Sequence, residues 1–111
     1  AAETVTVLYN KSDHLGSRRS TVEYLENLET VGFAKGALRL RSIEPRAYVF
    51  LLQRQLKSRG VYAGTVNGLA TRSTIRAILE FCRQEGYFDV CTHGPISYAS
   101  SARIMYTLED T

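Results

Sequence analysis

The sequence has few prolines, few cysteines and no long hydrophobic run. Only two of its 111 residues are proline, and 44% are hydrophobic against 23% charged, a composition that excludes disordered, collagen-like and low-complexity chains. The longest apolar run, from Ala47 to Leu52, is far below the roughly 20 residues that cross a bilayer. Because a domain typically takes roughly 100–200 residues, the length also excludes a large multi-domain enzyme. We therefore expect one small globular domain, with or without an extension, and no membrane span.

With two cysteines and two histidines, the chain has few of the residues that bind transition metals. A tetrahedral zinc site needs four ligands, and only His93 lies near Cys82 and Cys91 in the sequence. In an oxidising compartment the two cysteines can instead close a short loop, which stabilises a small domain by roughly 2–3 kcal/mol. The alternative is a pair of unconnected buried thiols. We predict the disulfide, with no metal and no cofactor.

The start of the chain indicates export. It begins Ala1-Ala2-Glu3 without a methionine, as a chain does after a signal peptidase has cut behind small residues. Disulfides persist in the compartments to which such chains are sent. The start and the cysteine pair together predict a periplasmic or secreted protein.

Acidic residues are missing from one long stretch of the chain. The formal net charge is +3, yet between Pro45 and Leu79 there are six basic residues and no acidic one. A cationic stretch on a small domain indicates an anionic or carboxylate-bearing partner, or else a helix face kept soluble by charge. A nucleic acid is a poor candidate for the partner, because the overall charge is modest for phosphate binding.

The first 44 residues are predicted to form an extension with one helix and two short strands. Residues 4–9 are rich in β-branched side chains, and residues 37–43 alternate apolar and polar side chains, so each segment is expected to form a strand and the two can pair. Between them, a Ser-Thr-Val-Glu capping-box pattern predicts a helix over 21–31, which Gly32 would end.

Residues 45–111 are predicted to form the main, helical domain. A glycine-rich turn, Gly60 to Gly68, separates the first two helices, and Gly86 ends the second. The expected fold is therefore mainly α (small α+β): a three-helix bundle on which the extension 1–44 packs. The three expected helices run from Pro45 to Ser58, from the N-cap Thr71 to about Gln84, and from about Ser97 to Leu108.

Four motifs follow one another in the middle of the chain, namely Leu52-Gln53, Gly60-Val61-Tyr62-Ala63-Gly64, Asn67-Gly68 and Ala70-Thr71. With these motifs the chain resembles the peptidoglycan-binding-like domain family. The resemblance spans about residues 46–85 and implies a three-helix bundle that attaches noncovalently to cell-wall peptidoglycan. Such bundles usually act as targeting modules of cell-wall hydrolases or transpeptidases. Only Leu69 lies between the last two motifs, so the loop is shorter than the family pattern.

Five residues around the glycine turn are candidate ligand contacts, namely Gln53, Tyr62, Asn67, Arg72 and Arg76. Stem peptides of peptidoglycan carry free carboxylates, which arginine binds with bidentate, charge-assisted hydrogen bonds. The tyrosine ring and the two amide side chains suit the apolar faces and hydroxyl groups of sugars. Each residue also has a structural alternative, with the tyrosine in the core, the asparagine forming the turn and the arginines as solvated charges.

The sequence contains no convincing catalytic constellation. The Cys-Thr-His-Gly sequence at 91–94 lacks an orienting third group, and a disulfide would remove its thiolate. Glu23 and Glu26 lie on one exposed face of the predicted helix. We therefore predict a non-catalytic exported domain that binds peptidoglycan. The alternative is a periplasmic protein-interaction module, an adaptor, activator or inhibitor of a cell-wall-modifying enzyme or a secretion component.

Overall fold

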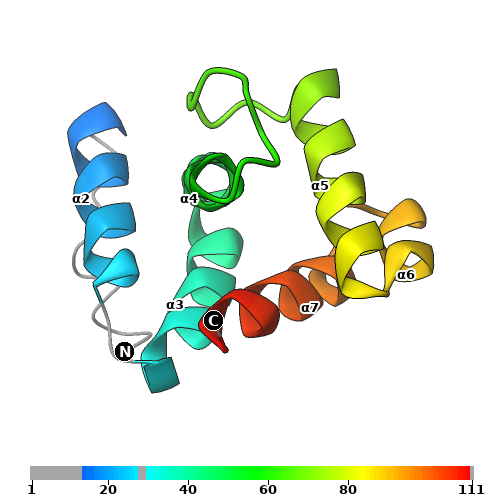
Figure 1. The fold of residues 1–111 in the computed structure, drawn as a ribbon. Helices are drawn as coiled ribbons and strands as arrows, with labels where there is room; N and C mark the ends of the chain where they lie inside the picture. Colours follow the sequence, from blue (N-terminus) through cyan, green and yellow to red (C-terminus); the bar gives the residue numbers. More distant parts are fainter. Residues whose placement is uncertain (1–13, 28–29, 111) are drawn as a thin grey trace.

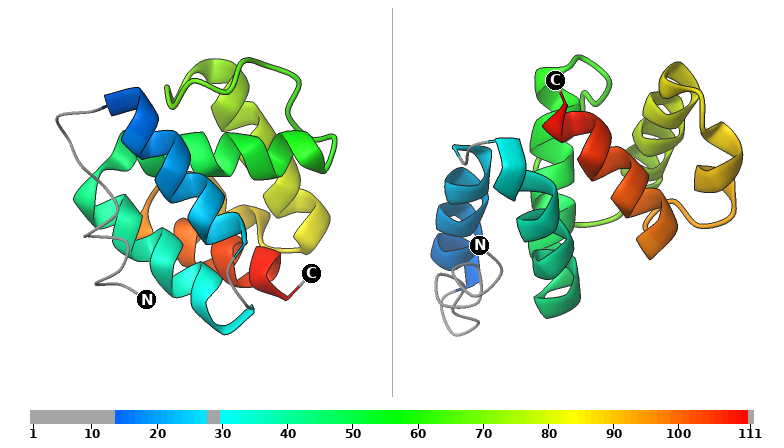
Figure 2. Two further views of the ribbon diagram at one scale, coloured as in Figure 1. Left: turned by 90° about the vertical axis from the view of Figure 1, so that its left-hand side faces the viewer. Right: turned by 90° about the horizontal axis from the view of Figure 1, so that it is seen from below.

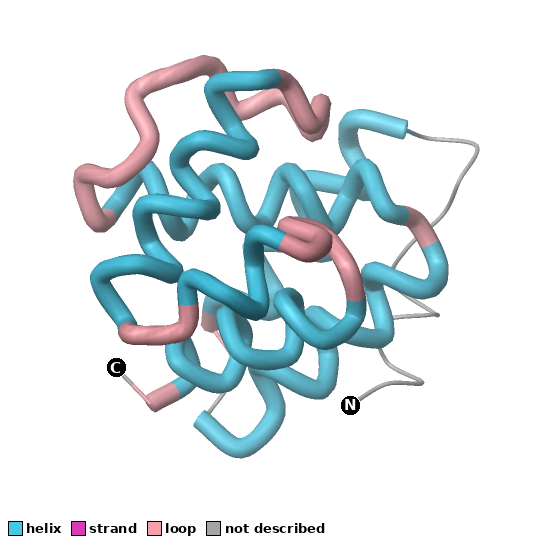
Figure 3. Tube along the Cα trace, turned by 90° about the vertical axis from the view of Figure 1, so that its right-hand side faces the viewer, coloured by secondary structure: helices cyan, strands magenta, loops and turns pink. Residues whose placement is uncertain are grey.

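The structure is a computed structural model that describes residues 14–27 and 30–110, and most of this length is helical. Figure 3 shows helices joined by loops, and neither described range contains a strand. The prediction of a mainly α fold is thus confirmed, and its β component is wrong. The helices are α2 (His14–Glu26), α3 (Thr30–Ile43), α4 (Pro45–Ser58), α5 (Arg72–Glu85), α6 (Phe88–Thr92) and α7 (Tyr98–Glu109), as labelled in Figure 1. None of them is long and apolar enough to cross a membrane.

The central helix is α4, which has its predicted bounds. Pro45 occupies the first turn, and the Glu44 carboxylate accepts a hydrogen bond from the backbone N–H of Arg46 at 3.3 Å. Helices α2 and α5 lie on opposite sides of α4 (Figures 1 and 2), so more than half of its circumference is covered. Its buried residues are Ala47, Tyr48, Val49, Phe50, Leu51, Leu52, Gln53 and Leu56.

Helix α3 replaces the strand that was predicted at 37–43. Phe33, Ala37 and Leu40 are buried at the i, i+4, i+7 spacing of a helix face. Because α3 packs against both α4 and α7, it has apolar side chains on two of its faces. Along residues 37–43 this produces the same alternation of apolar and polar residues that a half-buried strand would show. The other predicted strand, 4–9, lies outside the described residues.

The helix predicted over 21–31 begins and ends earlier in the structure. Helix α2 spans His14 to Glu26, so Ser20 lies inside it and not at its N-cap. Gly32 lies within α3 and ends no helix. Val22 and Leu25 are fully buried where α2 packs on α3 and α4. Tertiary packing therefore decides the position of α2, and the capping-box pattern was misleading.

Helix α3 also holds the C-terminal helix α7 in place. The Ala34 backbone N–H donates to the Glu109 carboxylate at 3.0 Å, and Arg41 Nε donates to the Ile96 carbonyl at 2.9 Å. One hydrophobic cluster includes residues of α2, α3, α4, α5, α6 and α7. The core is therefore continuous across the boundary that was placed between residues 44 and 45.

The predicted ends of α5 and α7 are confirmed by their caps. Thr71 Oγ1 accepts from the Thr74 backbone N–H at 3.4 Å, and Ser97 Oγ accepts from the Ser100 backbone N–H at 3.3 Å. Gly86 ends α5 with a left-handed backbone conformation at φ +89°. Thr71 and Gly86 thus act at the ends of α5 as the sequence predicted, and Ser97, which was expected to begin the last helix, is its N-cap.

The predicted disulfide between Cys82 and Cys91 is present, and both residues are fully buried. It joins the end of α5 to α6, the short helix at 88–92 that the sequence did not predict. Five residues are too few to show a helical period, so this helix follows from the covalent link and its packing.

Candidate functional site

The glycine turn is organised by the side chain of Gln53, which α4 places in the core with no exposed surface. Its Oε1 accepts from the backbone N–H groups of Asn67 at 2.9 Å and Gly68 at 2.8 Å. Its Nε2 donates to the Leu69 carbonyl at 3.0 Å and to Thr74 Oγ1 at 2.9 Å. One amide of α4 therefore fixes the end of the turn and the start of α5.

Tyr62 fills the inside of the turn. Only 6% of its surface is exposed, and its hydroxyl donates to the Thr65 carbonyl at 2.7 Å. A Cβ added at Gly64 would lie 2.6 Å from that hydroxyl oxygen, so a larger residue would displace the ring. The sequence 62–65 therefore forms a wall in which the ring and the glycine fit each other.

The end of the turn also needs a glycine. Gly68 has φ +80°, and a Cβ there would lie 2.8 Å from the Arg46 carbonyl oxygen. Asn67 Oδ1 accepts from the Leu69 backbone N–H at 3.0 Å, as in an Asx turn. From α2, Arg18 Nη1 donates to the Asn67 carbonyl at 3.3 Å. The amide of Asn67 thus acts within the turn, and α2 supports the turn from outside.

The five candidate ligand residues fall into two groups. Gln53, Tyr62 and Asn67 make the internal bonds of the turn, whereas Arg72 and Arg76 are exposed on α5. Within the described part of the chain, neither arginine makes an ion pair or a side-chain hydrogen bond. These two guanidinium groups are therefore free to meet a ligand.

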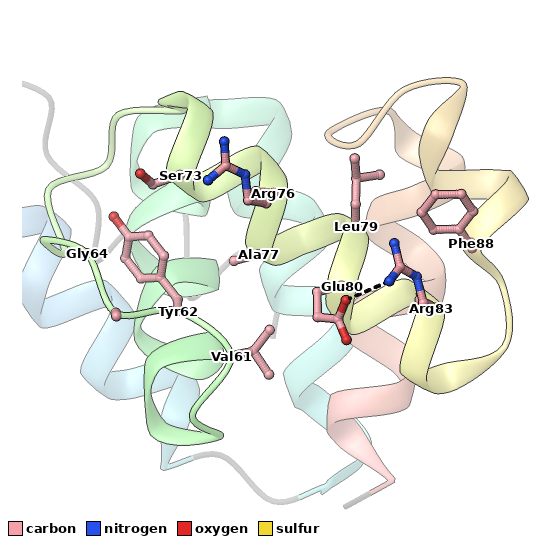
Figure 4. A pocket seen from close by; sticks show the side chains of 11 residues that line it. Val61, Tyr62, Gly64, Ser73, Arg76, Ala77, Leu79, Glu80, Arg83 and Phe88 are labelled. Carbon is pink, nitrogen blue, oxygen red and sulfur yellow. Dashed lines mark ion pairs between the residues drawn. The ribbon is translucent and has the colours of Figure 1, made fainter.

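A groove of about 650 Å³ lies between the turn and α5 (Figure 4). The turn lines it with residues 61–64, α5 lines it with one face between Ser73 and Arg83, and α6 contributes Phe88. Of the two free arginines, only Arg76 lines this groove. The groove therefore combines apolar walls with a cation.

Two further charges of α5 lie in the groove, and the sequence reasoning missed both. Glu80 Oε1 pairs with Arg83 Nη1 at 3.2 Å, and the Arg83 guanidinium lies 5.2 Å from the centre of the Phe88 ring. Arg76, Glu80 and Arg83 have the i, i+4, i+7 spacing that places residues on one helix face. Extending the face of Arg76 along the predicted helix would have found them.

Phe88 reaches the groove because of the disulfide. The bond between Cys82 and Cys91 holds α6 against α5, and Phe88 is the first residue of α6. One signal for this contact was present in the sequence, since Phe88 lies inside the loop that the two cysteines close.

The other cations of the basic stretch do not gather in the groove. Arg54 Nη2 pairs with Glu26 Oε1 at 3.1 Å, and Lys57 Nζ donates to the Gly64 carbonyl at 3.1 Å. Burial raises the pKa of Glu26 above its ordinary value, although the nearby charge of Arg54 acts in the opposite direction. The excess of positive charge between Pro45 and Leu79 is thus partly neutralised by α2.

Metal-ligating side chains do not cluster in the region that the structure describes. There, no three His, Cys, Asp or Glu side chains lie close enough to hold a metal ion. His93 is exposed, with Nδ1 at 2.8 Å from the Asp89 carbonyl oxygen. Cys91 is bonded to Cys82, so its sulfur is no thiolate.

Comparison of the chain with protein-family models, curated proteins and solved structures gives no significant match. The resemblance to the peptidoglycan-binding-like family thus remains a prediction from the motifs between residues 46 and 85. The chemistry of the site has to be inferred from the geometry of the groove.

Proposed function

We propose that this chain is a non-catalytic module that binds the peptide part of bacterial peptidoglycan. The observation that carries the proposal is the position of Arg76, an unpaired guanidinium in a groove with apolar walls. Guanidinium binds carboxylate through two parallel, charge-assisted hydrogen bonds. Stem peptides offer such carboxylates, and their small apolar side chains suit walls made by Val61, Ala77 and Leu79.

The remaining candidate residues receive different roles in this proposal. Arg72 lies one turn before Arg76 on α5, where its charge would attract an anion toward the groove. Gln53, Tyr62 and Asn67 would act indirectly, because their bonds hold the wall that faces Arg76. We therefore expect binding to depend on two arginines and on an intact turn.

The disulfide supports a location outside the cytoplasm. Disulfides form and persist in oxidising compartments such as the periplasm and the extracellular space. The cell wall lies in these compartments, so the covalent chemistry of Cys82 and Cys91 is compatible with the proposed ligand. We infer that the protein acts in the periplasm or after secretion.

Cosedimentation with insoluble peptidoglycan tests the proposal. The wild-type protein should pellet with the wall, and the double variant Arg72→Ala, Arg76→Ala should bind roughly tenfold more weakly, the loss expected for one charge-assisted contact. Arg39→Ala is the matched control, because Arg39 is exposed on α3 and does not line the groove. Wild-type protein that stays in the supernatant contradicts the proposal, and so does a double variant that pellets like the wild type.

A second candidate function is protein interaction with a cell-wall-modifying enzyme or a secretion component. Tyr98 and Tyr106 are 61% and 42% exposed on α7, eight residues apart and thus near one face of the helix. Exposed tyrosines are enriched at protein interfaces. Capture of a periplasmic enzyme that Tyr98→Ala, Tyr106→Ala abolishes, without wall binding by the wild type, would favour this candidate.

A further inference from the structure

We infer that the groove selects peptides that carry an ammonium group as well as a carboxylate, with Glu80 as the acceptor of the ammonium. The inference rests on the proposed function and names the class of ligand more narrowly. Its basis is the order of charges on the groove face of α5, which is positive at Arg76, negative at Glu80 and positive at Arg83.

The spacing of the first two charges suits a ligand with separated charges. Arg76 and Glu80 are four residues apart on one helix face, which corresponds to a rise of about 6 Å along the axis. A flexible four-carbon stem such as that of lysine spans a comparable length. A peptide can therefore place its carboxylate on Arg76 and its side-chain ammonium on Glu80.

Glu80 lines the groove, and two side chains of its own helix hold its carboxylate. Glu80 Oε1 pairs with Arg83 at 3.2 Å, and Oε2 accepts from Gln84 Nε2 at 3.3 Å. Arg83 is itself placed against the ring of Phe88. A carboxylate has about four lone-pair sites, so Glu80 can accept a further hydrogen bond while it keeps these two. Figure 4 shows its carboxylate beside Arg83, on the helix that faces the turn.

The apolar residues between the charges fit the stem of the same ligand. Ala77 and Leu79 belong to the groove face of α5, and Val61 faces them from the turn (Figure 4). A methylene chain between the two ligand charges would cover these side chains and exclude water from them. A dianionic ligand without an amine would instead meet the negative charge of Glu80, so the groove should discriminate against it.

A pair of synthetic peptides tests the inference by NMR titration of the full chain. The first is acetyl-Ala-Glu-Lys with a free C-terminal carboxylate. The second has norleucine in place of lysine, which keeps the stem and the carboxylates but lacks the ammonium. We expect the wild type to bind the lysine peptide about 2- to 5-fold more tightly, as an exposed ion pair would give. Glu80→Gln should reduce this ratio to about one, while Glu85→Gln, on the same helix but outside the groove, should leave it unchanged.

The inference is overturned if Glu80→Gln does not change the ratio of the two peptide affinities. If Glu80 only neutralises Arg83, Glu80→Gln will tighten both peptides and leave their ratio as it is in the wild type. A wild-type ratio of one also contradicts the inference. Cosedimentation with peptidoglycan distinguishes a failure of this inference from a failure of the proposed function. If the protein binds the wall but shows no peptide preference, only the role of Glu80 is wrong. A peptide preference without wall binding removes the proposed function, and the absence of both removes both.

Discussion

Gln53 of α4 donates a buried hydrogen bond of 2.9 Å to Thr74 of α5, and this bond ties together the two helices that the glycine turn connects. The oxygen of the same amide accepts hydrogen bonds from the backbone N–H groups of Asn67 and Gly68, and its nitrogen also donates to the Leu69 carbonyl. The groove thus depends on a side chain that does not line it. Replacing Gln53 in the core of α4 should therefore alter the conformation of the turn at the proposed binding surface.

Gln53→Leu should strongly destabilise the protein. The substitution leaves the backbone N–H groups of Asn67 and Gly68 without their acceptor, and each buried unsatisfied group costs about 1–3 kcal/mol. We expect the free energy of unfolding in urea to fall by about 2–4 kcal/mol. Gln55→Leu is the control, since Gln55 is half-buried and its amide donates to Glu26 at 3.0 Å. Equal losses in the two variants would contradict this account of the turn.

Two glycines with nearly the same positive φ should respond differently to alanine. Gly60 has φ +77° and nothing within 4 Å of an added Cβ, whereas an added Cβ at Gly68, with φ +80°, meets the Arg46 carbonyl oxygen at 2.8 Å. Gly60→Ala should cost only the left-handed strain of about 1–2 kcal/mol, and Gly68→Ala should cost clearly more. Thermal unfolding followed by circular dichroism compares them, and a Gly68→Ala variant as stable as Gly60→Ala would refute the close contact.

The disulfide should contribute measurably to stability. Replacing Cys82 and Cys91 by alanine reopens a loop of about ten residues, for which chain entropy gives a loss of about 2–3 kcal/mol. Urea denaturation of the double variant and of the oxidised wild type measures the difference. Mass spectrometry of the native protein should show two cysteines that resist alkylation. Freely labelled cysteines would remove both the link to α6 and the argument for an oxidising compartment.

Tyr48 should make the protein less stable at alkaline pH. Burial raises the pKa of its hydroxyl from 10.0 to about 12, so the folded state holds this proton when the unfolded state has lost it. The contribution is complete below pH 10 and is lost as the pH rises from 10 to 12. By pH 11 the loss relative to pH 9 should be on the order of 1 kcal/mol. Tyr48→Phe should lose less over the same interval, and parallel losses in both proteins would contradict the burial of this hydroxyl.

The sequence predicted the helices whose ends are specified locally. These ends can be read from a sequence pattern, because each depends on one residue and on backbone groups within one turn of it. The residues are Pro45, Thr71, Ser97 and Gly86. Before Pro45 the signals that were used pointed to the wrong positions, because Ser20 lies inside α2 and Gly32 lies inside α3. Helix α3 is covered on two faces by α4 and α7, so its buried side chains at 37–43 do not form the single apolar stripe of an ordinary surface helix. Packing between distant segments is what the sequence pattern did not contain.

The parts of the groove that depend on local sequence could be predicted, and the parts that depend on packing between distant segments could not. The location of the groove at the turn and Arg76 followed from local motifs, and the pairing of the cysteines followed from their spacing. The hydrogen bonds of Gln53 connect residues 9 to 21 positions apart, and they form only when α4, the turn and α5 are folded together. Phe88 joins the site through the tertiary placement of α6, whereas Glu80 lies on the same face of α5 as Arg76 and could have been found from the helix spacing.

The most direct test of the proposed site is chemical-shift mapping of the isotope-labelled chain with a soluble peptidoglycan fragment that contains the stem peptide. The proposal predicts that the largest shifts occur at residues 61–64 and on the groove face of α5 around Arg76, and that Arg76→Ala strongly reduces them. Shifts confined to α3 and α7, or no shifts at fragment concentrations of several millimolar, would contradict it.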